Sequence, residues 1–435
     1  MHTVRIRSRE ETDMGDRNFN RPAGARNVMG RPGASAEHPT AIGGLRHHNL
    51  ARGSFPTDQA PRPTLSCKGR MRVALFFASA VIGVPNLTPA QSQATSGPTL
   101  VSVGTPTRIQ ETDSLLISQP SGIATGARGA VFIGDISGGR VLQIGRTGAL
   151  ERILGKKGRG PGELVWPGAL AVSGDTLLAV YDVGARQVTF FSLRTGSFIK
   201  SVAIASARPA LAFRGSELLV TTFDLKLNAT VVPVTVNGGV GAPEGALPPI
   251  VSRLPMLAGG FYNAAVVADG SDVLTSFEVS SAVIRTRQGA RTGTMTELPA
   301  VRRRGVNEVL YDEMVRDPTA ARRIAFAHSV PMAAQMIGTN MLALATVDPT
   351  QVGRGFTGVY FVTLVDFAKK AVCPDLAVPV AVDPMPYATF RGDTLVVLVQ
   401  PDGKSDAAAS YIHRFWIDAA RCTWRPLPSP KRIGG

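Results

Sequence analysis

The chain has 435 residues, of which 44% are hydrophobic and 18% are charged, and its formal net charge is +15. The basic residues are scattered rather than gathered into a stripe, which favours a role in solubility, and we expect no nucleic acid partner because the signal-like segment described below predicts a protein outside the cytoplasm. A polyanionic partner in the cell envelope stays open as an alternative.

Residues 1–70 have no sustained apolar period. They contain four of the six histidines, and Arg and Lys outnumber Asp and Glu by 12 to 6. Such a segment cannot bury enough apolar surface to offset the entropy of ordering it, so we expect it to be disordered. We favour Met71 as the true start of the protein, with residues 1–70 upstream of it. A cytoplasmic tail before a signal anchor is the alternative.

Residues 71–94 have the pattern of a secretory signal peptide. Arg72 supplies a basic start, a 12-residue apolar run follows from Val73 to Val84, and small residues stand at Ala90, Ser92 and Ala94. The apolar run is short of the roughly 20 residues that a membrane span needs. We therefore expect an exported protein, periplasmic or secreted, without a stable membrane span after cleavage.

Beyond the predicted signal, a short β-type pattern recurs. An apolar stretch leads to a glycine with polar neighbours, and a second apolar stretch follows; the glycines are Gly126, Gly174, Gly215, Gly270, Gly338 and Gly392. Successive glycines are 48, 41, 55, 68 and 54 residues apart. Repetition at about 40 to 50 residues is typical of propellers and solenoids, and β-rich units favour a propeller. The sequence therefore predicts an all-β fold, a six-bladed β-propeller over residues 99–430.

Each predicted blade is a four-stranded antiparallel sheet whose innermost strand carries small residues, as in 122–125 and 169–172. A ring of blades leaves exposed edges unless its first and last blades are joined. The apolar segment 99–110 is the candidate closing strand. We expect it to pair with the last blade, outside either 413–416 or 422–424.

The first two predicted blades share a further pattern. Asp135 and Asp182 each stand six residues before a valine, and Arg140 and Arg186 are nearby. Here the chain resembles NHL-type, TolB-like six-bladed propellers, whose repeat runs from a strand through Asp, a loop and Arg to Val. The glycine-rich segment 155–163 resembles linkers of exported bacterial six-bladed propeller proteins. The resemblance implies an exported bacterial propeller, and it is specific in these two blades only.

The longest spacing between marker glycines accommodates a helical insertion, which we place at 305–330 between blades 4 and 5. Asn307 can cap a helix over 308–316, and Pro318 can begin a second helix that ends near His328. The insertion is interpreted as a packing decoration or as a lid over the central channel.

Only two cysteines, Cys373 and Cys422, follow the predicted signal peptide. An oxidising compartment permits a disulfide between them, which would pin the last blade. Two buried free thiols are the alternative.

The sequence predicts no catalytic residues. It has no Gly-x-Ser-x-Gly elbow and no His-Glu-x-x-His zinc helix, and 155–162 lacks the Lys-Ser/Thr ending of a phosphate-binding loop. His328 and His413 stand far apart in the sequence. The sequence does not identify a set of metal-ligating residues. The candidate channel or rim residues are Asp135, Arg140, Asp182, Arg186, Arg302, Arg303 and Arg304.

Each of these candidate residues could have a structural role or a ligand-binding role. A blade aspartate commonly accepts backbone N–H groups or pairs with a nearby arginine, although it could also face the channel. The run Arg302–Arg304 could bind an anion or could be a solvated surface.

The predicted function is a non-enzymatic binding or scaffold propeller that recognises an unknown protein, peptide or glycan through its rim loops. We expect a monomer that needs no cofactor. The alternative is a gluconolactonase-like hydrolase or lyase that holds Ca²⁺ in the central channel. That ion would need six or more oxygens around one point, and the available acids are Glu163, Asp182, Asp224 and Asp269.

Overall fold

The computed structural model describes residues 99–112, 117, 119–226, 228–253, 263–299, 302, 308–317, 328–352, 355–380, 387–401 and 409–434. The predicted disordered segment, the predicted signal peptide, Arg303, Arg304 and the second predicted helix (318–327) lie outside the described residues. Within the described part, no helix is long and apolar enough to cross a membrane.

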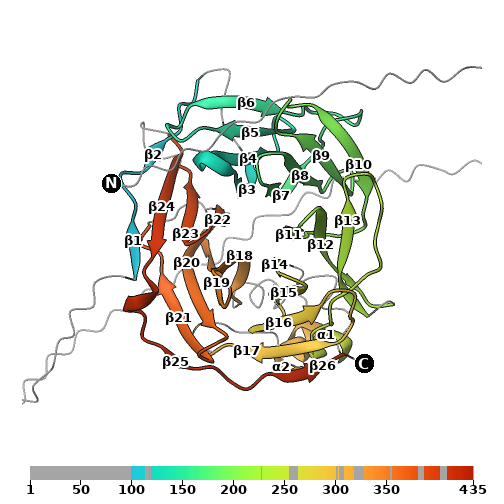
Figure 1. The fold of residues 1–435 in the computed structure, drawn as a ribbon, viewed down its shortest axis with the longest axis vertical. Coiled ribbons are helices and arrows are strands. Elements are labelled where there is room, and N and C mark those ends of the chain that lie inside the picture. Colours follow the sequence, from blue (N-terminus) through green and yellow to red (C-terminus); the bar gives the residue numbers. More distant parts are fainter. Residues whose placement is uncertain are drawn as a thin grey trace, which may run out of the picture. The chain divides into compact units, whose positions relative to one another are not determined.

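The described strands form six antiparallel sheets in a ring (Figure 1), which confirms the predicted six-bladed propeller. We number these sheets as blades 1 to 6. Blade 1 consists of β3 (Pro120–Thr125), β4 (Val131–Asp135), β5 (Arg140–Ile144) and β6 (Leu150–Leu154). Blade 2 consists of β7 (Pro167–Ser173), β8 (Leu177–Asp182), β9 (Gln187–Ser192) and β10 (Phe198–Ala203). Blade 3 consists of β11 (Leu211–Arg214), β12 (Glu217–Asp224) and β13 (Ala229–Thr235).

The last three blades each gain strands from distant parts of the chain. Blade 4 consists of β14 (Ala264–Asp269), β15 (Asp272–Phe277), β16 (Ala282–Arg287), β17 (Gly293–Glu297) and β26 (Lys431–Ile433). Blade 5 consists of β18 (Val330–Ile337), β19 (Met341–Val352), β20 (Gly355–Asp366), β21 (Ala371–Ala377) and β25 (Arg425–Pro426). Blade 6 consists of β22 (Tyr387–Arg391), β23 (Thr394–Val399), β24 (Tyr411–Ile417), β1 (Leu100–Ser102) and β2 (Thr107–Arg108).

Each blade buries both faces against its neighbours. In β4, Val131 and Ile133 pack in a cluster with Val396 of blade 6, whereas Phe132 packs in a cluster with Leu178 of blade 2. Successive side chains of a strand point to opposite faces. A continuous apolar strand therefore supplies two interfaces at once, and each fully buried side chain of this size contributes about 1.5–3 kcal/mol.

The ring closes through the first described strand. Leu100, Val101 and Ser102 of β1 pair with Ile417, Trp416 and Phe415 of β24. Strand β2 also pairs with β24, and β22 of blade 6 contacts β3 of blade 1. The prediction that 99–110 pairs outside 413–416 is confirmed, whereas 422–424 is not its partner.

Blade 3 departs from the predicted four strands. Where a fourth strand is expected, the structure has only isolated bridges, of Val234 with Val240 and of Val231 with Glu244. Glycine weakens strand pairing and proline lacks the N–H that a ladder needs, and the segment 238–245 contains four glycines and one proline. The buried Glu244 carboxylate instead accepts from Arg214 Nη1 at 2.6 Å.

The C-terminal segment runs along the outer strands of two blades. Strand β25 pairs with β21, and β26 pairs with β17 (Figure 1). Cys373 of β21 is disulfide-bonded to Cys422. The bond therefore ties this segment to blade 5, and not to the last blade as the sequence interpretation had it.

Helix α2 (Glu308–Arg316) stands between β17 and β18, with the bounds that the sequence predicts. Its Leu310 packs against the cluster that holds Ala264 and Phe277 of blade 4. The short helix α1 (Pro249–Arg253), which the sequence did not predict, packs against the same cluster through Val251 and Ile250.

The disulfide predicts a redox-dependent stability. It closes a loop with a sequence separation of 49 residues, and reduction should lower the free energy of unfolding by about 2–4 kcal/mol because the unfolded chain regains freedom. Guanidinium unfolding with and without dithiothreitol measures the loss. The double variant Cys373→Ser/Cys422→Ser should not respond to the reductant. Equal stability of the oxidised and reduced wild type would contradict the expectation.

Candidate binding face

The two ends of the blades differ in what they carry. At one end, which we call the glycine face, the turn between the first two strands of a blade contains its marker glycine. Five of the six marker glycines have φ between 53° and 63°, which favours glycine; they are Gly174, Gly215, Gly270, Gly338 and Gly392. The opposite end, which we call the entry face, is where β4, β8, β12 and β15 end. The predicted Asp and Arg candidates of blades 1 and 2 lie there.

Asp135 and Arg140 form a structural pair at the entry face. They are opposite each other in the β4–β5 ladder, and Arg140 Nε donates to Asp135 Oδ2 at 2.9 Å. Asp135 is 1% exposed, and its Oδ1 has no hydrogen-bond partner. The pair fixes the loop between β4 and β5 and leaves little of the carboxylate accessible to a ligand.

Asp182 organises the corresponding loop of blade 2. Its buried carboxylate accepts the backbone N–H groups of Val165 at 2.7 Å, Trp166 at 3.0 Å and Gly184 at 3.0 Å. The carboxylate thus joins the segment before β7 to the loop between β8 and β9 and is occupied by these backbone groups. Arg186 is exposed, and its positive φ of 53° marks the tight turn of this loop.

Arg302 also has protein partners. Its Nη1 lies 3.5 Å from Asp348 Oδ2, and its guanidinium carbon lies 4.1 Å from the ring centroid of Phe361. Asp348 further accepts from the hydroxyl of Ser329. This arginine therefore joins the segment before α2 to blade 5.

The four acids considered for calcium do not gather. Glu163 accepts from the N–H of Gly160 at 2.8 Å, a contact that lowers the pKa of Glu163, and it pairs with Lys156. Asp269 pairs with Arg285 at the glycine face, whereas Asp182 and Asp224 end strands at the entry face. In the described part of the chain, no three His, Cys, Asp or Glu side chains come together as a metal ion requires.

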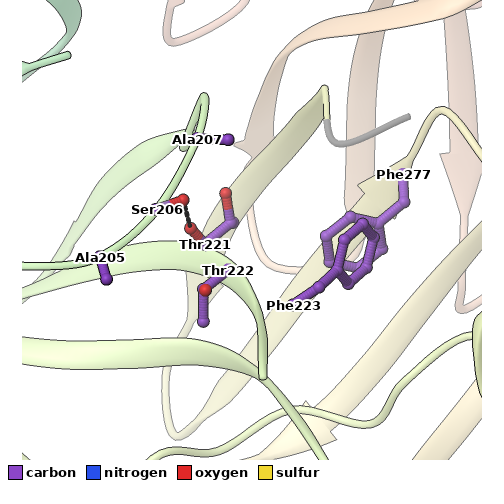
Figure 2. Close-up of a pocket in the computed structure, with 7 residues that line it drawn as sticks. All are labelled: Ala205, Ser206, Ala207, Thr221, Thr222, Phe223 and Phe277. Atoms are coloured by element: carbon purple, nitrogen blue, oxygen red, sulfur yellow. Dashed lines mark hydrogen bonds between the residues drawn. The ribbon is translucent and has the colours of Figure 1, made fainter. Parts of the chain in front are cut away.

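A pocket opens at the entry face between blades 3 and 4. Its volume is about 120 Å³, and it is lined by Ala205, Ser206, Ala207, Thr221, Thr222, Phe223 and Phe277. Figure 2 shows the hydroxyl-bearing residues on one side and the two aromatic rings on the other. The rings of Phe223 and Phe277 are 4.8 Å apart and tilted by 40°. The pocket thus combines an apolar wall with hydroxyl groups.

Hydrogen bonds from blade 2 hold the pocket wall in place. The buried hydroxyl of Tyr181 lies between the carbonyl oxygens of Ile204 and Ser206, and it accepts from the Ser206 N–H at 3.2 Å. Ser206 Oγ donates to the Thr221 carbonyl at 2.9 Å (Figure 2). Thr221 Oγ1 in turn accepts from the N–H of Ala210 at 2.8 Å. The wall is therefore preorganised rather than a loose loop.

A buried acid stands directly after the aromatic wall. Glu278 is 6% exposed, and its Oε2 accepts from Asn263 Nδ2 at 2.6 Å. Burial raises the pKa of Glu278 to about 7, although the Asn263 hydrogen bonds and the charge of Arg208 oppose that shift. Near neutral pH this side chain therefore exchanges between its neutral and its charged form.

Arg208 carries a positive charge beside the pocket residue Ala207. It is exposed and follows the pocket residue Ala207 in the sequence. Its charge acts on Glu278 of blade 4 and also lowers the pKa of Tyr387 of blade 6, although burial raises the pKa of Tyr387 more strongly. The Tyr387 hydroxyl donates to the Pro120 carbonyl of blade 1 at 2.6 Å.

Sequence reasoning missed Arg208, Asn263 and Glu278. None of them belongs to a motif, and the distance between them along the chain hides their proximity. One local signal existed. Glu278 interrupts the apolar and small residues that surround it in 273–283, and an acid in a buried strand end is expected to have a special role.

The sequence matches no known protein family and no curated protein sequence. Three solved structures illustrate what the chain is similar to. A Bacteroides fragilis protein described as exported is 12% identical, with 73% of this chain and 95% of that one covered and a TM-score of 0.49. A DUF4221 family member from Bacteroides vulgatus is 9% identical, with 73% and 97% covered and a TM-score of 0.48. Virginiamycin B lyase from Staphylococcus aureus is 13% identical, with 72% and 98% covered and a TM-score of 0.41. These likenesses say nothing about function.

The buried Glu278 predicts a pH-dependent stability. The folded protein holds this proton more tightly than the unfolded chain, because the pKa of Glu278 rises from 4.5 to about 7 on folding. The stabilisation that the Glu278 proton gives to the folded protein is therefore lost as the pH rises from 4.5 through about 7. As the pH rises from 5 to 8, the unfolding free energy of wild type should fall relative to that of Glu278→Gln. The difference between the two proteins should grow by about 2–3 kcal/mol over this range.

Urea unfolding of both proteins across this pH range measures the difference. Asp175→Asn, at an exposed aspartate in the turn between β7 and β8, is the control and should follow the wild-type pH profile. Parallel profiles for wild type and Glu278→Gln would show that Glu278 is charged throughout.

Proposed function

We propose that this protein is a non-catalytic binding propeller of the cell envelope that recognises a protein, peptide or glycan at its entry face. The observation that carries the proposal is the pocket between blades 3 and 4. Its walls come from two rigid sheets and a loop that Tyr181 and Thr221 hold in place. Binding sites are commonly concave, mostly preformed and lined by aromatic and a few polar groups.

The lining indicates what enters the pocket. A cavity of about 120 Å³ accommodates one small group, such as a short side chain or a methyl-bearing substituent of a sugar. Phe223 and Phe277 offer it an apolar surface, and the Ser206 and Thr222 side chains supply polar groups (Figure 2). Arg208, exposed beside the pocket, favours a partner with a negative charge next to the inserted group.

A hydrolase or lyase that works through a bound divalent ion has less support. Such a reaction needs several carboxylates directed at one point, and the described acids Glu163, Asp182 and Asp269 each have their own protein partner. Glu278 is a single acid, hydrogen-bonded to an amide. No described arrangement of side chains favours catalysis over binding.

Export is part of the proposal. The signal-like segment 71–94 supports it, and so does the disulfide between Cys373 and Cys422, because disulfides persist mainly in oxidising compartments. We further infer a relationship to NHL-type, TolB-like propellers. That inference depends on the Asp135–Arg140 element and its counterpart at Asp182 in blade 2.

Blocking the pocket should abolish recognition. In Ala207→Trp, an exposed pocket residue becomes an indole that fills the opening, and the captured partner should fall at least tenfold relative to wild type. The measurement is capture from a cell-envelope extract of the source organism on immobilised full-length protein, followed by mass spectrometry and glycan analysis. The matched control is Ala377→Trp, at an exposed alanine of β21.

The proposal requires a partner that wild type and Ala377→Trp retain and Ala207→Trp loses. Arg208→Glu should lose the same partner if that partner is acidic. Identical capture by wild type and Ala207→Trp would show that the pocket is not the binding site.

A further inference from the structure

Three arginines gather where the last blade meets the first. Arg391 ends β22 of blade 6, and Arg146 lies in the turn between β5 and β6 of blade 1. Arg414 lies in the middle of β24, next to Ile412, which packs against blade 1. Arg146 and Arg391 are exposed, whereas Arg414 is partly buried. We call these three residues the seam arginines.

Distances around Gly129 place two of the seam arginines close together. A Cβ added at Gly129 would stand 3.2 Å from Arg391 Nη1 and 3.8 Å from Arg146 Cγ. Two arginine side chains from different blades thus lie against one glycine. Arg414 donates to Thr107, and Thr107 Cγ2 would stand 3.2 Å from a Cβ added at Gly148, in the same turn as Arg146. Burial lowers the pKa of Arg414, and the charges of Arg146 and Arg391 lower it further.

The seam arginines have no counter-charge among the described residues. None of them forms an ion pair, and Arg414 donates only to Thr107 Oγ1, at 2.8 Å, from its Nη1. Its Nη2 is buried without a hydrogen-bond partner. The acids nearest to Arg391, Arg146 and Arg414 in the sequence have other partners. Asp393 accepts from Trp416 Nε1 at 2.9 Å, Glu151 accepts from Gln143 Nε2 at 2.8 Å, and Asp418 pairs with Arg421 Nε at 2.8 Å.

Arg214 and Arg285, by contrast, each have carboxylate partners. Three like charges beside one another, one with a buried and unpaired N–H group, destabilise the protein unless an anion neutralises them. Guanidinium groups present planar forks of N–H donors that match phosphate and carboxylate oxygens. Forks from three positions suit an anion with at least three oxygens.

We infer that the seam arginines form a binding site for a tetrahedral oxyanion, phosphate or sulfate, either free or as a group of a larger molecule. The site lies toward the glycine face, away from the pocket, and does not depend on the proposed function. Because Arg391 and Arg414 belong to blade 6 and Arg146 belongs to blade 1, a bound anion would join the two blades. It would therefore stabilise the closed ring.

Thermal unfolding of the full-length protein tests this inference. At the same ionic strength, ~10 mM inorganic phosphate or sulfate should raise the melting temperature by about 2 °C relative to chloride, because a ligand that binds only the folded state stabilises it. Arg391→Gln and Arg146→Gln should lose this rise. In chloride alone both variants should melt at or above the wild-type temperature, because substitution relieves repulsion between like charges.

The matched control is Arg194→Gln, at an exposed arginine in the corresponding turn of blade 2, and it should respond to phosphate like wild type. Glycerol 3-phosphate tests whether the natural ligand is a free ion or a group of a larger molecule. A larger rise in melting temperature than with inorganic phosphate indicates a phosphate ester of a larger molecule, and an equal rise indicates the free ion. Equal responses of all four proteins, or no response to any of the three anions, would overturn the inference. So would variants that melt lower in chloride and keep the phosphate response.

Discussion

The pairing of β1 with β24 is the interaction on which the rest of the structure depends. Every blade of this protein is apolar on both faces, as the opposite packing of Val131 and Phe132 in β4 illustrates. Such a sheet is stable only between two neighbours, and a row of them leaves two uncovered ends unless it closes. Here the closing strand β1 is the first described strand, and the blade that it joins is the last of the six along the chain. Contact between β22 and β3 completes the ring.

Closure also explains where the distinctive chemistry lies. The pocket at the entry face is formed where blades 3 and 4 meet, and its hydrogen-bonded wall begins at Tyr181 in blade 2. The seam arginines lie where blades 6 and 1 meet. In both places the side chains come from sheets that only the ring brings together. Blade 3 lacks a regular fourth strand, and the buried pair Arg214–Glu244 fills part of that role.

The architecture could be predicted because its signals are local. Each marker glycine with its two apolar stretches reports one hairpin, and helix α2 follows from the cap and spacing around 308–316. The site could not be predicted in this way, because Arg208, Glu278 and Tyr387 are 70 and 109 residues apart in the sequence and belong to no motif. Strands β25 and β26 were missed for another reason. They have two and three residues, too few for any periodicity, and only their partners in blades 5 and 4 define them. Asp135 and Asp182 were found by pattern, yet in the structure Asp135 pairs with Arg140 and Asp182 accepts backbone N–H groups.

Hydrogen–deuterium exchange of the segment 99–110 tests ring closure most directly. In the structure, the N–H of Val103 donates to the Arg414 carbonyl and that of Ile109 to the Ser410 carbonyl, both at 2.8 Å. A closed ring predicts that these amides exchange as slowly as those of the central strand β4, because opening them requires opening the last blade. Exchange within seconds in 99–110, beside slow exchange in β23 and β24, would contradict the closed ring.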